Sequence, residues 1–173
     1  LHMGEPTLGY SKASHPAQQR LRAILCELGG TDLSATPHGI DGCGIPVLAM
    51  PLAAMASALA RMANSMGLPR RRAAASDLIL TAMSTHPDLV GGFVVKTGAE
   101  GVYAGILPRL GIGIALKIDD GATRAAETAM AALLRHYGEL ADGDGERVAD
   151  LLQPEILNAV GDPVGVVRSV IDW

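Results

Sequence analysis

Three short β-prone runs lie close together between Phe93 and Ile118, and they are the strongest constraint on the fold. They cover residues 93–95, 102–107 and 112–118, and the last two are separated only by residues 108–111. Parallel neighbours need a crossover of about a dozen residues or more, whereas antiparallel neighbours can be joined by a short turn. The spacing therefore predicts a three-stranded antiparallel meander.

Helical patterns flank this meander on both sides. The hydroxyl of Ser14 can cap a helix, and Pro16 is typical of the first turn of one. Apolar residues at helical spacing follow, so a helix is predicted to start here. Further helices are predicted over residues 52–66, 71–85, 122–137 and 147–152, and a β-like run over residues 164–171. Methionines along the second helix, Met66 included, are expected to fill the core. The predicted class is α/β of the α+β type, with an antiparallel sheet flanked by helices.

Composition limits the function classes. The 173 residues are 49% hydrophobic, enough for one domain core, but only 3% aromatic, so small aliphatic side chains and methionine must fill it. A formal charge of −4 argues against nucleic-acid binding. The sequence contains no uncharged apolar stretch of about 18 residues, which is the length expected of a membrane span. With only Cys26 and Cys43, the chain fits reducing surroundings, so we expect a cytoplasmic protein, although a start at Leu1 leaves targeting undecided.

A glycine-rich segment, residues 39–46, presents the first chemical groups. Its glycines allow a sharp turn that displays Asp41 and Cys43. A thiolate is a soft metal ligand and a nucleophile, and a carboxylate two residues away can orient a ligand. Zinc usually takes three or four protein ligands, and the position of His38 matches no strong zinc pattern. The segment can therefore be interpreted either as a purely structural turn or as a functional site.

The second candidate is Lys96, which follows Phe93-Val94-Val95 and precedes Thr97 and Gly98. The chain has only three lysines. An ammonium buried in an apolar strand needs an acceptor or a lowered pKa, and a neutral lysine can take a proton from a hydroxyl. Gly98 would let a substrate lie along the strand edge. The alternative is a lysine that extends to the surface at a strand end.

Several segments together resemble the asparaginase II family, the rhizobial type of L-asparaginase. They are residues 2–6, the run Tyr-Ser-Lys-Ala-Ser-His-Pro-Ala-Gln-Gln at 10–19, Asp-Gly-Cys-Gly at 41–44, Lys-Thr-Gly-Ala-Glu-Gly-Val-Tyr at 96–103, and residues 113–121. The resemblance covers essentially the whole chain. Members are similar in fold to serine β-lactamases and bacterial glutaminases, whose Lys-Thr-Gly strand resembles Lys96-Thr97-Gly98.

The resemblance implies hydrolysis of L-asparagine to L-aspartate and ammonia through a serine acyl-enzyme. It implies proton transfer by Lys96, substrate contacts from Asp41, Thr97 and Gly98, and a zinc-binding thiolate at Cys43. A homodimer is also implied. We expect Lys96 and Cys43 to face one shared pocket.

Three departures from the family pattern qualify these expectations. The sequence contains neither a Ser-x-x-Lys motif nor the family's Asn-Cys-Ser-Gly-Lys-His segment. The nucleophile is therefore expected outside residues 1–173, in a larger asparaginase of which this is the carboxy-terminal portion or one domain. A family stretch of roughly a dozen residues is also absent at Val90-Gly91. The alternatives are a non-catalytic truncated module, or a related glutaminase or β-lactamase-like serine hydrolase.

Overall fold

The computed structural model describes residues 2–86, 93–140 and 146–170. Its helices are α1 (Pro16–Gly29), α2 (Leu52–Asn64), α3 (Arg70–Thr85), α5 (Thr123–His136) and α6 (Glu146–Leu152). Its strands are β1 (His38–Ile40), β2 (Pro46–Leu48), β3 (Val95–Thr97), β4 (Val102–Leu107), β5 (Ile112–Lys117), β6 (Glu155–Leu157) and β7 (Pro163–Val166). The predicted mixed α/β class with antiparallel strands is confirmed.

The central sheet has the order β3-β4-β5, and both pairings are antiparallel. Lys96 lies opposite Ala104, which in turn lies opposite Ala115. The predicted meander is thus confirmed, and β3 forms one edge of it. A likeness to the serine β-lactamase fold stays a prediction.

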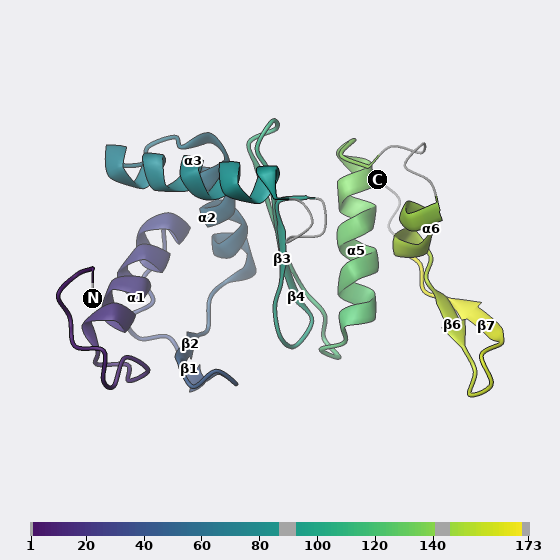
Figure 1. Ribbon diagram of the computed structural model, residues 1–173, viewed down its shortest axis with the longest axis horizontal. Coiled ribbons are helices and arrows are strands. Elements are labelled where there is room, and N and C mark those ends of the chain that lie inside the picture. The colour runs from purple at the N-terminus through teal and green to yellow at the C-terminus, as the bar shows by residue number, and fades with distance from the viewer. Residues whose placement is uncertain (1, 87–92, 141–145, 171–173) are drawn as a thin grey trace.

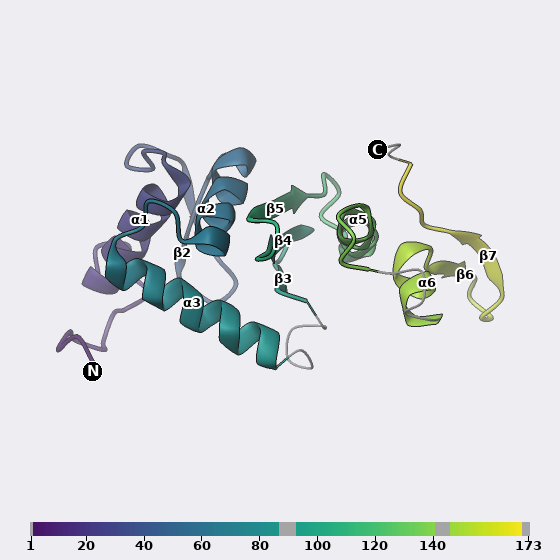
Figure 2. The ribbon, with the colours of Figure 1, turned by 90° about the horizontal axis from the view of Figure 1, so that it is seen from above.

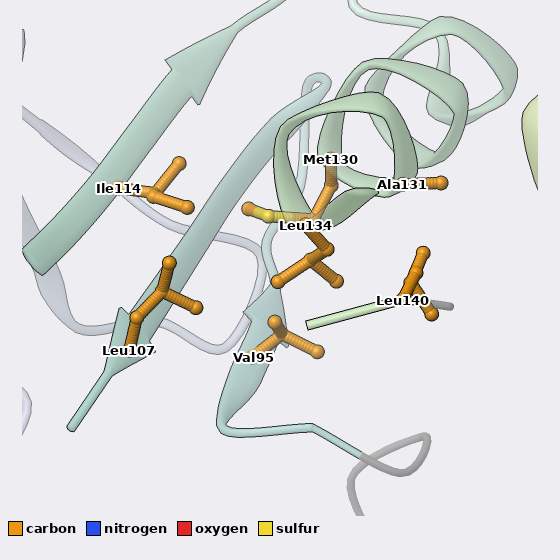
Figure 3. Packing of buried hydrophobic residues seen from close by; sticks show 7 residues of the cluster. All are labelled: Val95, Leu107, Ile114, Met130, Ala131, Leu134 and Leu140. Atoms are coloured by element: carbon orange, nitrogen blue, oxygen red, sulfur yellow. The ribbon is translucent and has the colours of Figure 1, made fainter. Parts of the chain in front are cut away.

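Helices cover both faces of this sheet, as Figures 1 and 2 show: α2 and α3 lie on one side and α5 on the other. Alternate residues of each strand point to opposite faces, so the sheet contributes to two cores. Toward α2 and α3, Val94 and Ile106 pack with Leu80. Toward α5 and the residues that follow it, a larger cluster contains Val95, Leu107, Ile114, Met130, Ala131, Leu134 and Leu140 (Figure 3).

Helix α2 lies unusually close to β5 at Gly113. A methyl group at Gly113 would overlap with the carbonyl oxygen of Ala56 and with the amide nitrogen of Ala60. Both are backbone atoms of α2, which cannot rotate away as a side chain can. The absence of a side chain at Gly113 therefore permits the backbone of α2 to pack directly against β5.

Three details differ from the sequence-based predictions. The ring of His15, and not the hydroxyl of Ser14, caps α1, because its Nδ1 accepts the amide hydrogen of Ala17 at 3.1 Å. Helix α2 ends at Asn64, which leaves Met66 outside the core and 72% exposed. The hairpins β1–β2 and β6–β7 were not predicted, apart from a β-like run that overlaps β7. The Val90-Gly91 junction lies outside the described residues.

We predict that Gly113→Ala destabilises the protein by about 3 kcal/mol, because overpacking against a helix backbone can be relieved only by moving α2. Chemical denaturation monitored by circular dichroism measures this loss. Gly165→Ala is the matched control, since a methyl group on that strand glycine would meet Ile156 at an ordinary 3.6 Å. Equal stabilities of the two variants would contradict the importance of this contact.

Candidate functional site

The β1–β2 hairpin presents the Asp41 and Cys43 pair. Its strands pair His38 with Leu48 and Ile40 with Pro46. The amide of Gly44 donates to the carbonyl oxygen of Asp41 at 2.8 Å, and the amide of Asp41 donates to that of Ile45 at 2.9 Å. Gly44 has φ +83°, a conformation that L side chains rarely adopt, so the glycine closes the turn.

The carboxylate of Asp41 bonds within this turn. One oxygen accepts the amide hydrogen of Gly42 at 2.7 Å, and the other lies 3.7 Å from the Cys43 sulfur. Both side chains are exposed. The structure therefore brings the two predicted residues together, with Asp41 positioned to shape the turn as well as to meet a ligand.

Lys96 is exposed on the edge strand β3. Its Nζ donates a hydrogen bond to the carbonyl oxygen of Thr97 at 2.6 Å. The burial cost considered for a lysine in an apolar strand does not arise in this part of the protein. The sequence-based alternative of a lysine that reaches the surface matches this geometry, and an exposed amine also remains accessible to other groups.

Thr97 and Gly98 continue the strand into a tight turn. Thr97 is exposed and lies opposite Tyr103, so the strand's alternation directs it to the opposite face from Lys96. The amide of Gly98 donates to the carbonyl oxygen of Val102 at 2.8 Å, and a methyl group on Gly98 would meet the Val102 side chain at 3.2 Å. Burial, with the charge of Glu127 as a smaller cause, raises the pKa of Tyr103, which keeps its hydroxyl protonated.

A cavity of about 460 Å³ lies between α1, the β1–β2 hairpin, α2 and the ends of β4 and β5. Sequence spacing gave no sign of it, because its walls come from separate elements. The residues that line it are Ala13, Gln18, Gln19, Leu21, Arg22, Leu25, His38, Pro46, Val47, Leu48, Met50, Leu52, Met55, Val102 and Lys117.

Neither Lys96 nor Cys43 lines this cavity. The hydrogen bonds of each also stay local, within β3 for Lys96 and within the hairpin turn for Cys43. A pocket shared by these two residues therefore stays a prediction.

The described residues do not form a complete metal site. No group of three or more histidine, cysteine, aspartate or glutamate side chains among them could hold an ion. Cys43 and Asp41 offer donors of suitable chemistry, but zinc takes three or four protein ligands. These two residues alone do not fit zinc.

Side chains within and next to residues 10–19 hold the segment that precedes α1 against the start of that helix. Nε2 of His15 bonds to the carbonyl oxygen of Pro6 at 2.8 Å, and Gln18 donates to that of Tyr10 at 2.9 Å. Arg20 pairs with Glu5 through both carboxylate oxygens, and this hydrogen bonding lowers the pKa of Glu5. These contacts fasten the preceding segment to the helix.

Among the helices of the described residues, none is long and apolar enough to cross a lipid bilayer. The helix-covered antiparallel sheet is typical of a mixed α/β protein. The sequence matches the L-asparaginase II family over residues 1–169, and the chain belongs to that family. No curated protein matches the sequence. Membership makes the protein asparaginase-like, an amidohydrolase with an asparagine-like small-molecule substrate.

Proposed function

We propose that the protein hydrolyses L-asparagine to L-aspartate and ammonia, as part of a larger asparaginase. The family match over residues 1–169 carries this proposal. A serine outside these residues attacks the side-chain amide, ammonia leaves, and water cleaves the resulting aspartyl ester. Because Ser-x-x-Lys is absent from the sequence, residues 1–173 supply groups that assist the reaction rather than the nucleophile.

Lys96 is the proposed proton-transfer group of this reaction. Its Nζ is exposed, and its present acceptor is a carbonyl oxygen of its own strand, a bond that a reacting hydroxyl could replace. Within the described strands, β3 pairs only with β4, so its other edge has backbone groups available to a substrate. Thr97 and Gly98 lie at the end of that edge, which supports substrate contacts there.

Asp41 and Cys43 are proposed to act as a second group. Asp41 would orient the substrate, and Cys43 would supply one thiolate to a zinc ion whose other ligands come from elsewhere. The exposure of both side chains and the 3.7 Å separation of Cys43 sulfur and Asp41 oxygen support this pairing.

The resemblance also leads us to propose a homodimer that resides in the cytoplasm. Light scattering of the purified protein would measure the mass of the assembly, and fractionation of cells would locate it. A monomer at all accessible concentrations would remove the dimer from the proposal.

We predict that the full-length protein releases ammonia from L-asparagine faster than from L-glutamine and leaves a chromogenic β-lactam intact. A coupled ammonia assay and absorbance of the β-lactam measure the three rates. Preference for glutamine or the β-lactam would favour the related serine hydrolases. Binding of asparagine without any ammonia would favour a non-catalytic module.

We predict that Lys96→Ala in the full-length protein lowers asparagine turnover by at least about 100-fold, the usual scale of lost proton-transfer assistance. Lys12→Ala, at an exposed lysine of the amino-terminal segment, is the control and should keep wild-type turnover. Turnover of the Lys96 variant within about threefold of wild type would exclude Lys96 from proton transfer.

We predict that Cys43→Ser lowers the zinc content of the full-length protein, because a hydroxyl is a poorer zinc ligand than a thiolate. Cys26→Ser is the matched control: Cys26 is half-buried, and its sulfur accepts the amide hydrogen of Leu33 at 3.4 Å. Inductively coupled plasma mass spectrometry gives zinc per chain. The same zinc content in both variants would refute Cys43 as a ligand.

A further inference from the structure

The cavity beside the β1–β2 hairpin has a wall that favours the apolar part of a ligand. Leu21 and Leu25 of α1, Val47 and Leu48 of β2, and Leu52 and Met55 of α2 form a largely apolar wall. Its volume of about 460 Å³ lies in the range of small-molecule sites. A polar amide placed against these six residues would lose hydration, because none of their side chains can form a strong hydrogen bond with it. An apolar ligand of larger size would gain from burial there.

The charged groups of the wall all carry the same sign. Arg22 of α1 and Lys117 of β5 line the cavity, and no lining residue in the described part of the chain is acidic. Neither Arg22 nor Lys117 forms an ion pair with a described residue. Arg22 donates to the side-chain oxygen of Gln19 at 2.7 Å, and Lys117 donates to the carbonyl oxygen of Ile118.

Two carboxylates near these cations, Asp32 and Asp120, form hydrogen bonds with other residues. Asp32 and Asp120 interact electrostatically with Arg22 and Lys117 respectively, but neither lines the cavity. Asp32 accepts hydrogen bonds from Ser34, and Asp120 accepts one from Arg124 at 2.8 Å. The cavity thus combines an apolar wall with cationic groups that retain hydrogen-bonding capacity for an anion.

We propose that this cavity binds a medium-chain organic anion, with its apolar tail against α1 and α2 and its carboxylate at Arg22 and Lys117. This site is separate from the asparagine chemistry proposed for Lys96, which does not line the cavity. Charge complementarity selects an anion over a neutral or cationic amphiphile, and the apolar wall selects a tail over a compact polar metabolite.

Isothermal titration calorimetry of the full-length protein with decanoate, below its micelle concentration, tests the proposal. We predict saturable one-site binding, and no saturable binding of decyltrimethylammonium, which has the same tail and the opposite charge. Removing both cations with Arg22→Gln and Lys117→Gln should weaken decanoate binding by about tenfold or more. Equal binding of the two amphiphiles would overturn the proposal.

A steric variant locates the ligand. Leu21→Trp should abolish decanoate binding, because Leu21 lines the cavity and is 41% exposed, leaving space for the larger side chain to enter it. Leu78→Trp is the matched control on α3, where the leucine is 72% exposed and lies outside the cavity wall. Unfolding temperatures verify that both variants fold, and the double charge variant tests the site independently.

Saturating asparagine should leave the affinity for decanoate unchanged. Competition between the two ligands would show that the cavity belongs to the substrate site and would overturn the separate role proposed here. Identical decanoate binding by the Leu21 and Leu78 variants would place the ligand elsewhere on the protein.

Discussion

The close contact between α2 and β5 at Gly113 is the constraint on which the helix-covered sheet depends. Backbone atoms of Ala56 and Ala60 occupy the space where any side chain would project. This contact fixes α2 against one face of the sheet, while α5 packs against the other face, where Gly105 lies next to Met130. Because α1 packs on α2, the position of α2 also sets where α1 and the cavity wall lie.

The alternation of residues along β3 places Lys96 and Thr97 on opposite faces of the sheet. Lys96 follows Val95, which belongs to the core beneath α5, so Lys96 points toward the other face and Thr97 back toward α5. A substrate along the β3 edge would therefore meet the amine and the hydroxyl from different sides. The cavity joins α1, α2 and the hairpin instead, and its cationic groups and apolar wall give that region a different binding chemistry.

Local patterns predicted the long elements well. Helical spacing gave α1, α2, α3, α5 and α6, and short connections gave the β3-β4-β5 meander. The hairpins β1–β2 and β6–β7 were not predicted from the sequence. Their strands are only three or four residues long and rich in exposed positions, so they show no strong alternation of apolar and polar residues. His15 caps α1 because its ring forms hydrogen bonds with the amide of Ala17 and with the carbonyl oxygen of Pro6. Residue type alone does not predict this geometry.

The amino-acid sequence by itself determined the family, the class of fold and the close pairing of Asp41 with Cys43, since these follow from residue identity and from neighbours a few positions apart. Only the tertiary structure decided that Lys96 is exposed on a sheet edge and that Arg22 and Lys117 line an apolar cavity. Those arrangements arise where elements distant in sequence pack together, and the backbone approach at Gly113 that permits such packing leaves no periodic signal in the chain.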